Sequence, residues 1–309
     1  MKLRILKLSI YTLIIIVIIY FVYDKLNKKD SSEYAFLSPI PLVQSISNSI
    51  GEVLTSRGGL RKSVERALEG SSGTYGIALK NLKTDESYYL NEHKYFDSAS
   101  LYKLWIMATA YDLIEKGKLK EDEVLTQEIA ILNEKFNIAS ESAEFTEGEI
   151  SLTVKSAINQ MITISHNYAA LLLSERIRLA SVREYLKSKG FLESKIGTQS
   201  TLPTVTPLDI ELFFEKLYKG ELANQESTQK MIDVLTKQTF KNKLPKTLPE
   251  DVLIAHKTGE LDYFTHDGGI IFSDKGNYII VVMSESKFPL GAEGRIADIS
   301  KNVYEYFTK

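Results

Sequence analysis

Cysteine is absent from the sequence, which excludes disulfide bonds, a thiolate nucleophile and a zinc site with cysteine ligands. We expect no metal and no other cofactor. Internal repeats and low-complexity segments are also absent, and contents of 44% hydrophobic and 25% charged residues exclude the disordered and fibrous classes.

The sequence also lacks a strong excess of positive or negative charge, since its formal net charge is -2. The first thirty residues hold six Lys/Arg and two Asp, so the remainder carries 32 basic (38 − 6) and 38 acidic (40 − 2) residues. A body with a net charge of -6 is not expected to bind nucleic acid.

The longest uncharged run, Leu8 to Tyr23, lies close to the N-terminus. As a helix it would span roughly 24 Å, a little less than the ~30 Å hydrocarbon core of a membrane. No A-x-A cleavage pattern follows it, so we favour an uncleaved anchor over residues 1–30 rather than a removed signal peptide. We predict a tether over 31–55, a folded domain over 56–309, and a single-pass protein of the cell membrane with an extracytoplasmic domain.

Hydrophobic periodicity in the body indicates an α+β fold. Strands are expected at both ends: two within 74–93 around the turn at 83–85, and three late, over 252–261, 266–274 and 277–286. Helices are expected over 60–69, 100–117, 122–132, 153–164, 167–180, 181–189, 207–219 and 294–307. Strands from both ends of the chain predict one antiparallel sheet flanked by helices, with an inserted all-helical subdomain.

Ser100 and Lys103 stand three residues apart at the start of the helix expected over 100–117. This spacing places the hydroxyl and the ammonium on one face of a helical turn. A lysine whose pKa is lowered by burial or by nearby cations can take the proton of a serine and make it a nucleophile. Taken alone, the pattern is more simply explained by a capping serine beside a solvated lysine.

Two further segments carry candidate functional groups. At a helix–helix junction, Ser165 has a hydroxyl that can relay a proton, and Asn167 has an amide that can hold a carbonyl or orient a lysine. In a predicted strand, Lys257 and Thr258 can bind a carboxylate, and Gly259 lets a ligand's backbone come close. Each segment alone also fits a structural role.

Together the three segments resemble S-x-x-K, S-D-N and K-T-G, the motif set of class A β-lactamases and penicillin-binding proteins. They occur in the family's order, separated by 65 residues (165 − 100) and 92 residues (257 − 165). The resemblance covers roughly Leu60 to Lys309 and implies a β-lactamase/transpeptidase-like fold.

The resemblance also implies roles. Ser100 would be the acylated nucleophile, Lys103 its general base or proton shuttle, and Ser165 the donor of a proton to the leaving nitrogen. The backbone N–H groups of Ser100 and Glu260 would form the oxyanion hole.

The same resemblance implies that the substrate is bound by Asn167, Lys257, Thr258 and Gly259. Asn167 would orient the substrate and Lys103, whereas Lys257 and Thr258 would bind the substrate carboxylate.

The sequence departs from the family at two places. His166 stands where the family has aspartate, and it either alters local hydrogen bonding or acts as a catalytic base. The interval over 187–209 contains no Glu-x-x-Leu-Asn segment, whose glutamate holds the deacylating water in efficient class A enzymes. Glu193 is the only carboxylate of that interval before Asp209, and we interpret it as an exposed loop residue.

The pair His266-Asp267 is expected on the strand beside K-T-G, where it either supports the carboxylate site or is a structural pair. We favour the structural role.

The predicted function is that of a class A β-lactamase-like serine hydrolase. It would act through an acyl-enzyme on β-lactams or related peptidoglycan peptides, with slow deacylation. The alternatives are a D-Ala-D-Ala peptidase or penicillin-binding protein, and a non-catalytic β-lactam-binding sensor. We expect a monomer whose partners are a small-molecule β-lactam or peptidoglycan-derived peptide and, through its N-terminal helix, the membrane.

Overall fold

The computed structural model describes residues 58–198 and 201–309. The predicted anchor over 1–30 and tether over 31–55 lie outside these residues, as does the predicted start of the domain at 56. Among the residues that the structure describes, no helix is both long and apolar enough to cross a membrane.

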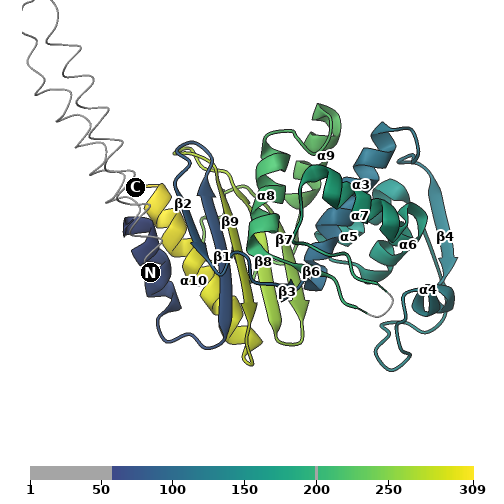
Figure 1. Cartoon of the computed structure of the whole chain (residues 1–309), viewed down its shortest axis with the longest axis horizontal. Helices are drawn as coiled ribbons and strands as arrows, with labels where there is room; N and C mark the ends of the chain where they lie inside the picture. The colour runs from purple at the N-terminus through teal and green to yellow at the C-terminus, as the bar shows by residue number, and fades with distance from the viewer. Residues whose placement is uncertain (1–57, 199–200) are drawn as a thin grey trace, which may run out of the picture. The chain divides into compact units, whose positions relative to one another are not determined.

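A five-stranded antiparallel sheet with the order β2-β1-β9-β8-β7 forms the centre of the domain (Figure 1). The early part of the chain contributes β1 (Thr74–Asn81) and β2 (Ser87–Leu90), and the late part contributes β7 (Ile254–Leu261), β8 (Phe264–Ile271) and β9 (Tyr278–Glu285). β1 pairs with β9 along its whole length. This pairing of distant segments confirms the predicted α+β fold.

Both faces of the sheet are covered, which explains the continuous apolar run of β9. Ile280 and Val282 pack on one face with the helix over 58–68 and with α10 (Pro289–Phe307). Ile279, Val281 and Met283 belong to the hydrophobic cluster on the other face, because successive strand residues point to opposite sides. α10 begins at Pro289 rather than at the predicted 294, with proline in the first helical turn.

Helices dominate the segment between β2 and β7. The predictions over 153–164, 167–180, 181–189 and 207–219 are confirmed to within three residues at each end, whereas α9 was not predicted. The elements are η1 (Ala99–Tyr102), α3 (Lys103–Glu115), α4 (Ile129–Lys135), α5 (Val154–Thr163), α6 (Asn167–Ile177), α7 (Leu179–Lys189), α8 (Pro207–Tyr218) and α9 (Gln225–Leu235).

The predicted helix over 122–132 is wrong in its first half. β4 (Val124–Glu128) pairs with β5 (Glu149–Thr153), and α4 starts only at Ile129. The β-branched residues of the two strands favour an extended backbone, and Thr126 and Ser151 share a hydrogen bond of 2.7 Å across the ladder. The inserted subdomain therefore contains a strand pair in addition to its helices.

A second short ladder holds the segment that precedes α3. β3 (Phe96–Asp97) pairs with β6 (Thr204–Val205), and the Ser98 N–H donates to the Pro203 carbonyl at 2.8 Å. Two-residue strands have no periodicity that a sequence can show. The segment ahead of α3 is nevertheless fixed to the loop ahead of α8.

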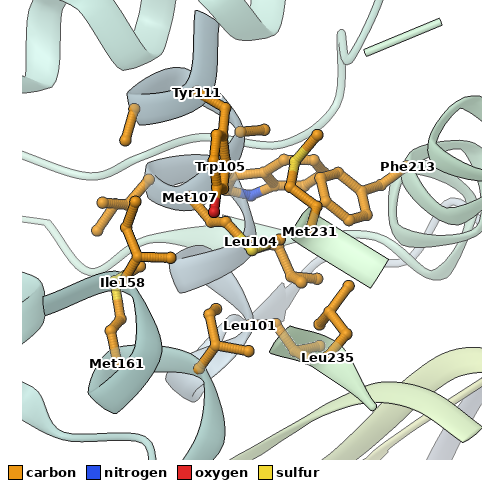
Figure 2. Close-up of a cluster of buried hydrophobic side chains, with 14 of the residues drawn as sticks. Leu101, Leu104, Trp105, Met107, Tyr111, Ile158, Met161, Phe213, Met231 and Leu235 are labelled. Carbon is orange, nitrogen blue, oxygen red and sulfur yellow. The ribbon is translucent and has the colours of Figure 1, made fainter. Parts of the chain in front are cut away.

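The helix α3 contributes Leu104, Trp105 and Met107 to the cluster of buried hydrophobic side chains in Figure 2. Five consecutive residues, Leu104 to Ala108, are fully buried, so the helix is covered on every side. Trp105 meets Phe213 of α8 edge to face at 5.4 Å between ring centroids. Because α3 lacks a solvent face over this stretch, the lysine in its first turn is also buried.

Candidate active site

Ser100 lies in η1, between β3 and α3. The preceding residue, Ala99, has a φ of 44°, in the left-handed region that costs a non-glycine residue roughly 1–2 kcal/mol. Such strain persists only where the surrounding structure imposes it, and here the β3–β6 ladder and the packing of β7 against η1 do so. Ser100 is half-buried and lines an open cavity of about 430 Å³.

Lys103 is buried with its ammonium against the segment that joins α5 to α6. Its Nζ donates to the Ser165 carbonyl at 2.6 Å, to Ser165 Oγ at 3.1 Å and to Asn167 Oδ1 at 2.8 Å. These acceptors and the charge of Glu144 favour the ammonium, but burial outweighs them and lowers the pKa of Lys103 to about 7. An amine with that pKa is a competent proton acceptor near neutral pH.

The turn that holds Ser165 makes these contacts possible. Ser165 has a φ of 56°, again in the left-handed region, and α6 begins two residues later at Asn167. With this backbone, both the carbonyl oxygen and the hydroxyl of Ser165 face the Lys103 ammonium.

Lys257, on β7, binds the same hydroxyl. Its Nζ donates to Ser165 Oγ at 3.1 Å and to the Thr258 carbonyl at 2.8 Å. Burial, reinforced by the nearby positive charge of Lys103, lowers the pKa of Lys257 well below its ordinary value. Because Ser165 Oγ accepts from two lysines, both of its lone pairs are used and its own hydrogen remains to be donated.

Gly259 sets the distance between β7 and the turn that carries Ser100. A Cβ at this position would stand 3.1 Å from the Ser98 carbonyl oxygen and 3.2 Å from both Ala99 Cβ and Ser100 N. A side chain at this position would therefore require the neighbouring backbone to move by a few tenths of an ångström. The absence of a side chain at Gly259 thus matters for packing against the protein's own backbone, in addition to the predicted approach of a ligand.

The structure brings the predicted residues together around one cavity. Its lining includes the predicted residues Ser100, Ser165, Asn167, Thr258 and Glu260. Lys103 and Lys257 lie behind this lining and touch it through Ser165.

His166 acts as the N-cap of α6. Its Nδ1 accepts the Ala169 N–H at 3.1 Å, which is the bond that an aspartate side chain would accept at an N-cap. His166 also borders the cavity. The geometry supports the structural interpretation of the histidine, since the capping nitrogen is occupied.

The pair His266-Asp267 is buried within β8, beside the K-T-G strand. His266 Nδ1 accepts the Ser284 N–H at 3.2 Å, and Nε2 donates to the Asp97 carbonyl at 2.9 Å. Burial lowers the pKa of His266 to about 4, so the imidazole is neutral. The ring therefore ties β8 to the segment ahead of Ser100.

Asp267 binds inside the domain as well. Its carboxylate accepts the Leu244 N–H at 3.1 Å and contacts His256 Nδ1 at 2.9 Å. Both members of the pair thus have structural partners.

Glu193 is partly buried and hydrogen-bonded, so its prediction as an exposed loop residue is wrong. Its carboxylate contacts His93 Nδ1 at 2.7 Å and accepts from Thr206 Oγ1 at 2.8 Å. These bonds connect the loop of Glu193 to the turn after β2 and to the start of α8. Ser100 borders two cavities, and the described residues that line them do not include Glu193.

Two site residues were missed by the sequence reasoning. Glu144 lines the cavity and accepts from Asn167 Nδ2 at 3.3 Å, and Lys243 is fully buried and ion-paired with Glu260. Both lie in irregular segments with no motif around them. Only the tertiary fold brings them to the cavity.

A serine and a lysine one turn apart, joined through a second serine to a strand lysine, define a serine hydrolase of the S-x-x-K type. Residues 59–307 match the sequence model of a family described as the Beta-lactamase enzyme family. The chain belongs to this family.

Individual relatives are distant but similar over most of their length. The chain is 24% identical to Beta-lactamase VEB-1 of Pseudomonas aeruginosa over 268 residues, which is 79% of this chain and 89% of that protein. A β-lactamase structure from Sphaerobacter thermophilus superposes with a TM-score of 0.71 at 24% identity, covering 81% of this chain and 97% of that one. The acyl-enzyme complex of a PBP-A mutant with penicillin G also gives a TM-score of 0.71, at 22% identity, covering 81% and 96% of the two chains.

Gly259→Ala tests whether the approach of β7 positions Ser100. The added methyl group must displace the Ser98–Ser100 backbone by a few tenths of an ångström. We expect acylation of Ser100 by an activated acyl donor, followed by mass spectrometry, to slow by about 10- to 100-fold. Gly294→Ala is the matched control, because a Cβ there meets nothing within 4 Å. Equal acylation rates in the two variants would contradict the positioning role.

Proposed function

We propose that the protein forms an acyl-enzyme on Ser100 with β-lactams or related peptidoglycan peptides and hydrolyses that ester slowly. The observation that carries the proposal is the hydrogen-bond network in which Ser165 joins Lys103 to Lys257 beside Ser100. Relatives named as β-lactamases, and the penicillin G acyl-enzyme of PBP-A, support β-lactams as acyl donors.

Acylation begins with proton transfer from Ser100 Oγ to the neutral amine of Lys103. Oγ forms a bond to the carbonyl carbon of the substrate, and the carbonyl oxygen takes up the negative charge. The backbone N–H groups of Ser100 and Glu260 stabilise this oxyanion, a contribution on the order of 3 kcal/mol for each donor.

Collapse of the intermediate then breaks the carbon–nitrogen bond. The leaving nitrogen takes a proton from the Ser165 hydroxyl, whose hydrogen is not used by either lysine. Ser165 recovers a proton from the Lys103 ammonium, to which it is already hydrogen-bonded at 3.1 Å. The products of this step are the Ser100 ester and an amine, which stays attached to the acyl group in an opened β-lactam and leaves when the substrate is a linear peptide.

Substrate orientation falls to groups on both sides of the cavity. Lys257 and Thr258 supply a positive charge and a hydroxyl for the substrate carboxylate, and Asn167 supplies an amide for a substrate carbonyl. Gly259 leaves room for the substrate backbone along β7.

Slow deacylation is supported by the carboxylates of the segment in which efficient class A enzymes carry their deacylating glutamate. The interval over 187–209 has only Glu193 and Asp209, and Asp209 accepts the N–H groups of residues 193 and 194. A second cavity of about 330 Å³ beside Ser100 is lined by apolar residues, which include Phe136 and Leu171, and by polar residues, which include Asn167 and Glu260. Neither Glu193 nor Asp209 belongs to this lining.

A pre-steady-state experiment with a chromogenic β-lactam tests the proposal. We expect a burst of about one equivalent of opened β-lactam, followed by much slower turnover, because the ester forms faster than it is hydrolysed. Mass spectrometry should place the adduct on Ser100.

Ser100→Ala should abolish both the burst and the adduct, whereas Ser142→Ala, at an exposed loop serine, should leave them unchanged. Rapid turnover without a burst would contradict slow deacylation. Tight reversible binding without an adduct would instead support a non-catalytic sensor.

We further propose that residues 1–30 anchor a monomeric, extracytoplasmic enzyme in the cell membrane. The uncharged run from Leu8 to Tyr23 supports this location. On fractionation of cells, penicillin labelling should follow the membrane for the full chain and the soluble fraction for a chain without residues 1–30. Labelling in the soluble fraction for both chains would contradict the anchor.

A further inference from the structure

The ammonium of Lys243 is buried beside the active-site cavity. Its side chain is fully inaccessible, and within the described part of the chain its one ion-pair partner is the carboxylate of Glu260. A buried ammonium without a partner is strongly destabilising, so this bond fixes where the Glu260 side chain lies. Glu260 itself is 53% exposed and lines both cavities that Ser100 borders.

Lys243 lies close to Lys257, the lysine of the K-T-G strand. Its positive charge contributes to the lowered pKa of both Lys257 and His266. Two buried lysines therefore lie close to the end of the cavity that Thr258 and Glu260 line. An arrangement of this kind attracts an anionic group.

Glu260 places a carboxylate of the protein at this same end. It neutralises one of the two lysines and adds a negative charge that an incoming carboxylate must approach. We infer that Glu260 is a specificity-determining residue: its side chain caps Lys243 and weakens the selection for substrates that carry a carboxylate at this position. The inference rests on the proposed acylation of Ser100 and concerns which acyl donors that site prefers.

The role of the side chain is separate from that of the backbone N–H of the same residue. Glu260→Gln keeps the backbone N–H and retains an oxygen that accepts from Lys243, so the buried ammonium keeps a hydrogen-bond partner. The substitution removes only the negative charge.

A matched pair of acyl donors isolates this effect. Benzylpenicillin carries the carboxylate, and its methyl ester has the same ring without the charge. The quantity to measure is the ratio of the second-order rate constants for acylation of Ser100 by the acid and by the ester. A change that merely perturbs folding or the nucleophile moves both rates and leaves their ratio unchanged.

We expect Glu260→Gln to raise the acid-to-ester ratio about tenfold, and the gain to shrink as the salt concentration rises. Lys243→Met, which removes the capped cation, should lower the ratio. Glu285→Gln is the control, since Glu285 is a half-exposed carboxylate paired with Lys94 at 3.2 Å and borders neither cavity of Ser100.

The outcomes separate this inference from the proposed function. If neither compound acylates Ser100 in the unsubstituted protein, the proposed function fails. If both acylate it and Glu260→Gln leaves the ratio within twofold of the unsubstituted protein, the capping role of Glu260 is overturned.

Discussion

The burial of the Lys103 ammonium between three segments of the chain is the constraint on which the site depends. The side chain leaves the first turn of α3, bonds the Ser165–Asn167 turn, and meets Lys257 of β7 through a shared hydroxyl. Burial of the Lys103 side chain lowers its pKa to about 7 and makes a base out of an ordinarily protonated amine. The charge of Lys103 adds to the burial that lowers the pKa of Lys257.

The rest of the fold holds this unfavourable arrangement in place. α3 is covered on all sides by apolar residues, so its first turn cannot rotate towards solvent without exposing the core. Left-handed residues on both sides of the contact, Ala99 and Ser165, and the close approach at Gly259 add local strain that only the complete structure supports. Stability supplied by the sheet and the helical core thus offsets the cost of a strained site with two buried lysines.

Much of the fold and the candidate site follows from local patterns. The apolar run of β9 predicted a strand, and the spacing of Ser100 and Lys103 predicted a shared helical face. β4 was missed because its pairing partner lies about twenty residues further on, and a short apolar stretch next to a helix shows no period that distinguishes strand from helix. The left-handed turn at Ser165 and the pairing of Lys243 with Glu260 depend on tertiary contacts that no local pattern contains.

The most direct test of the account is a titration of the Lys103 side chain itself. Nuclear magnetic resonance of protein labelled at the lysine side chains, with the signal assigned by its loss in Lys103→Met, reports the protonation of this one amine. We predict a midpoint near the value of about 7 that burial imposes. A midpoint close to that of an exposed lysine, about 10.4, would contradict it, because Ser100 would then lack a base at neutral pH.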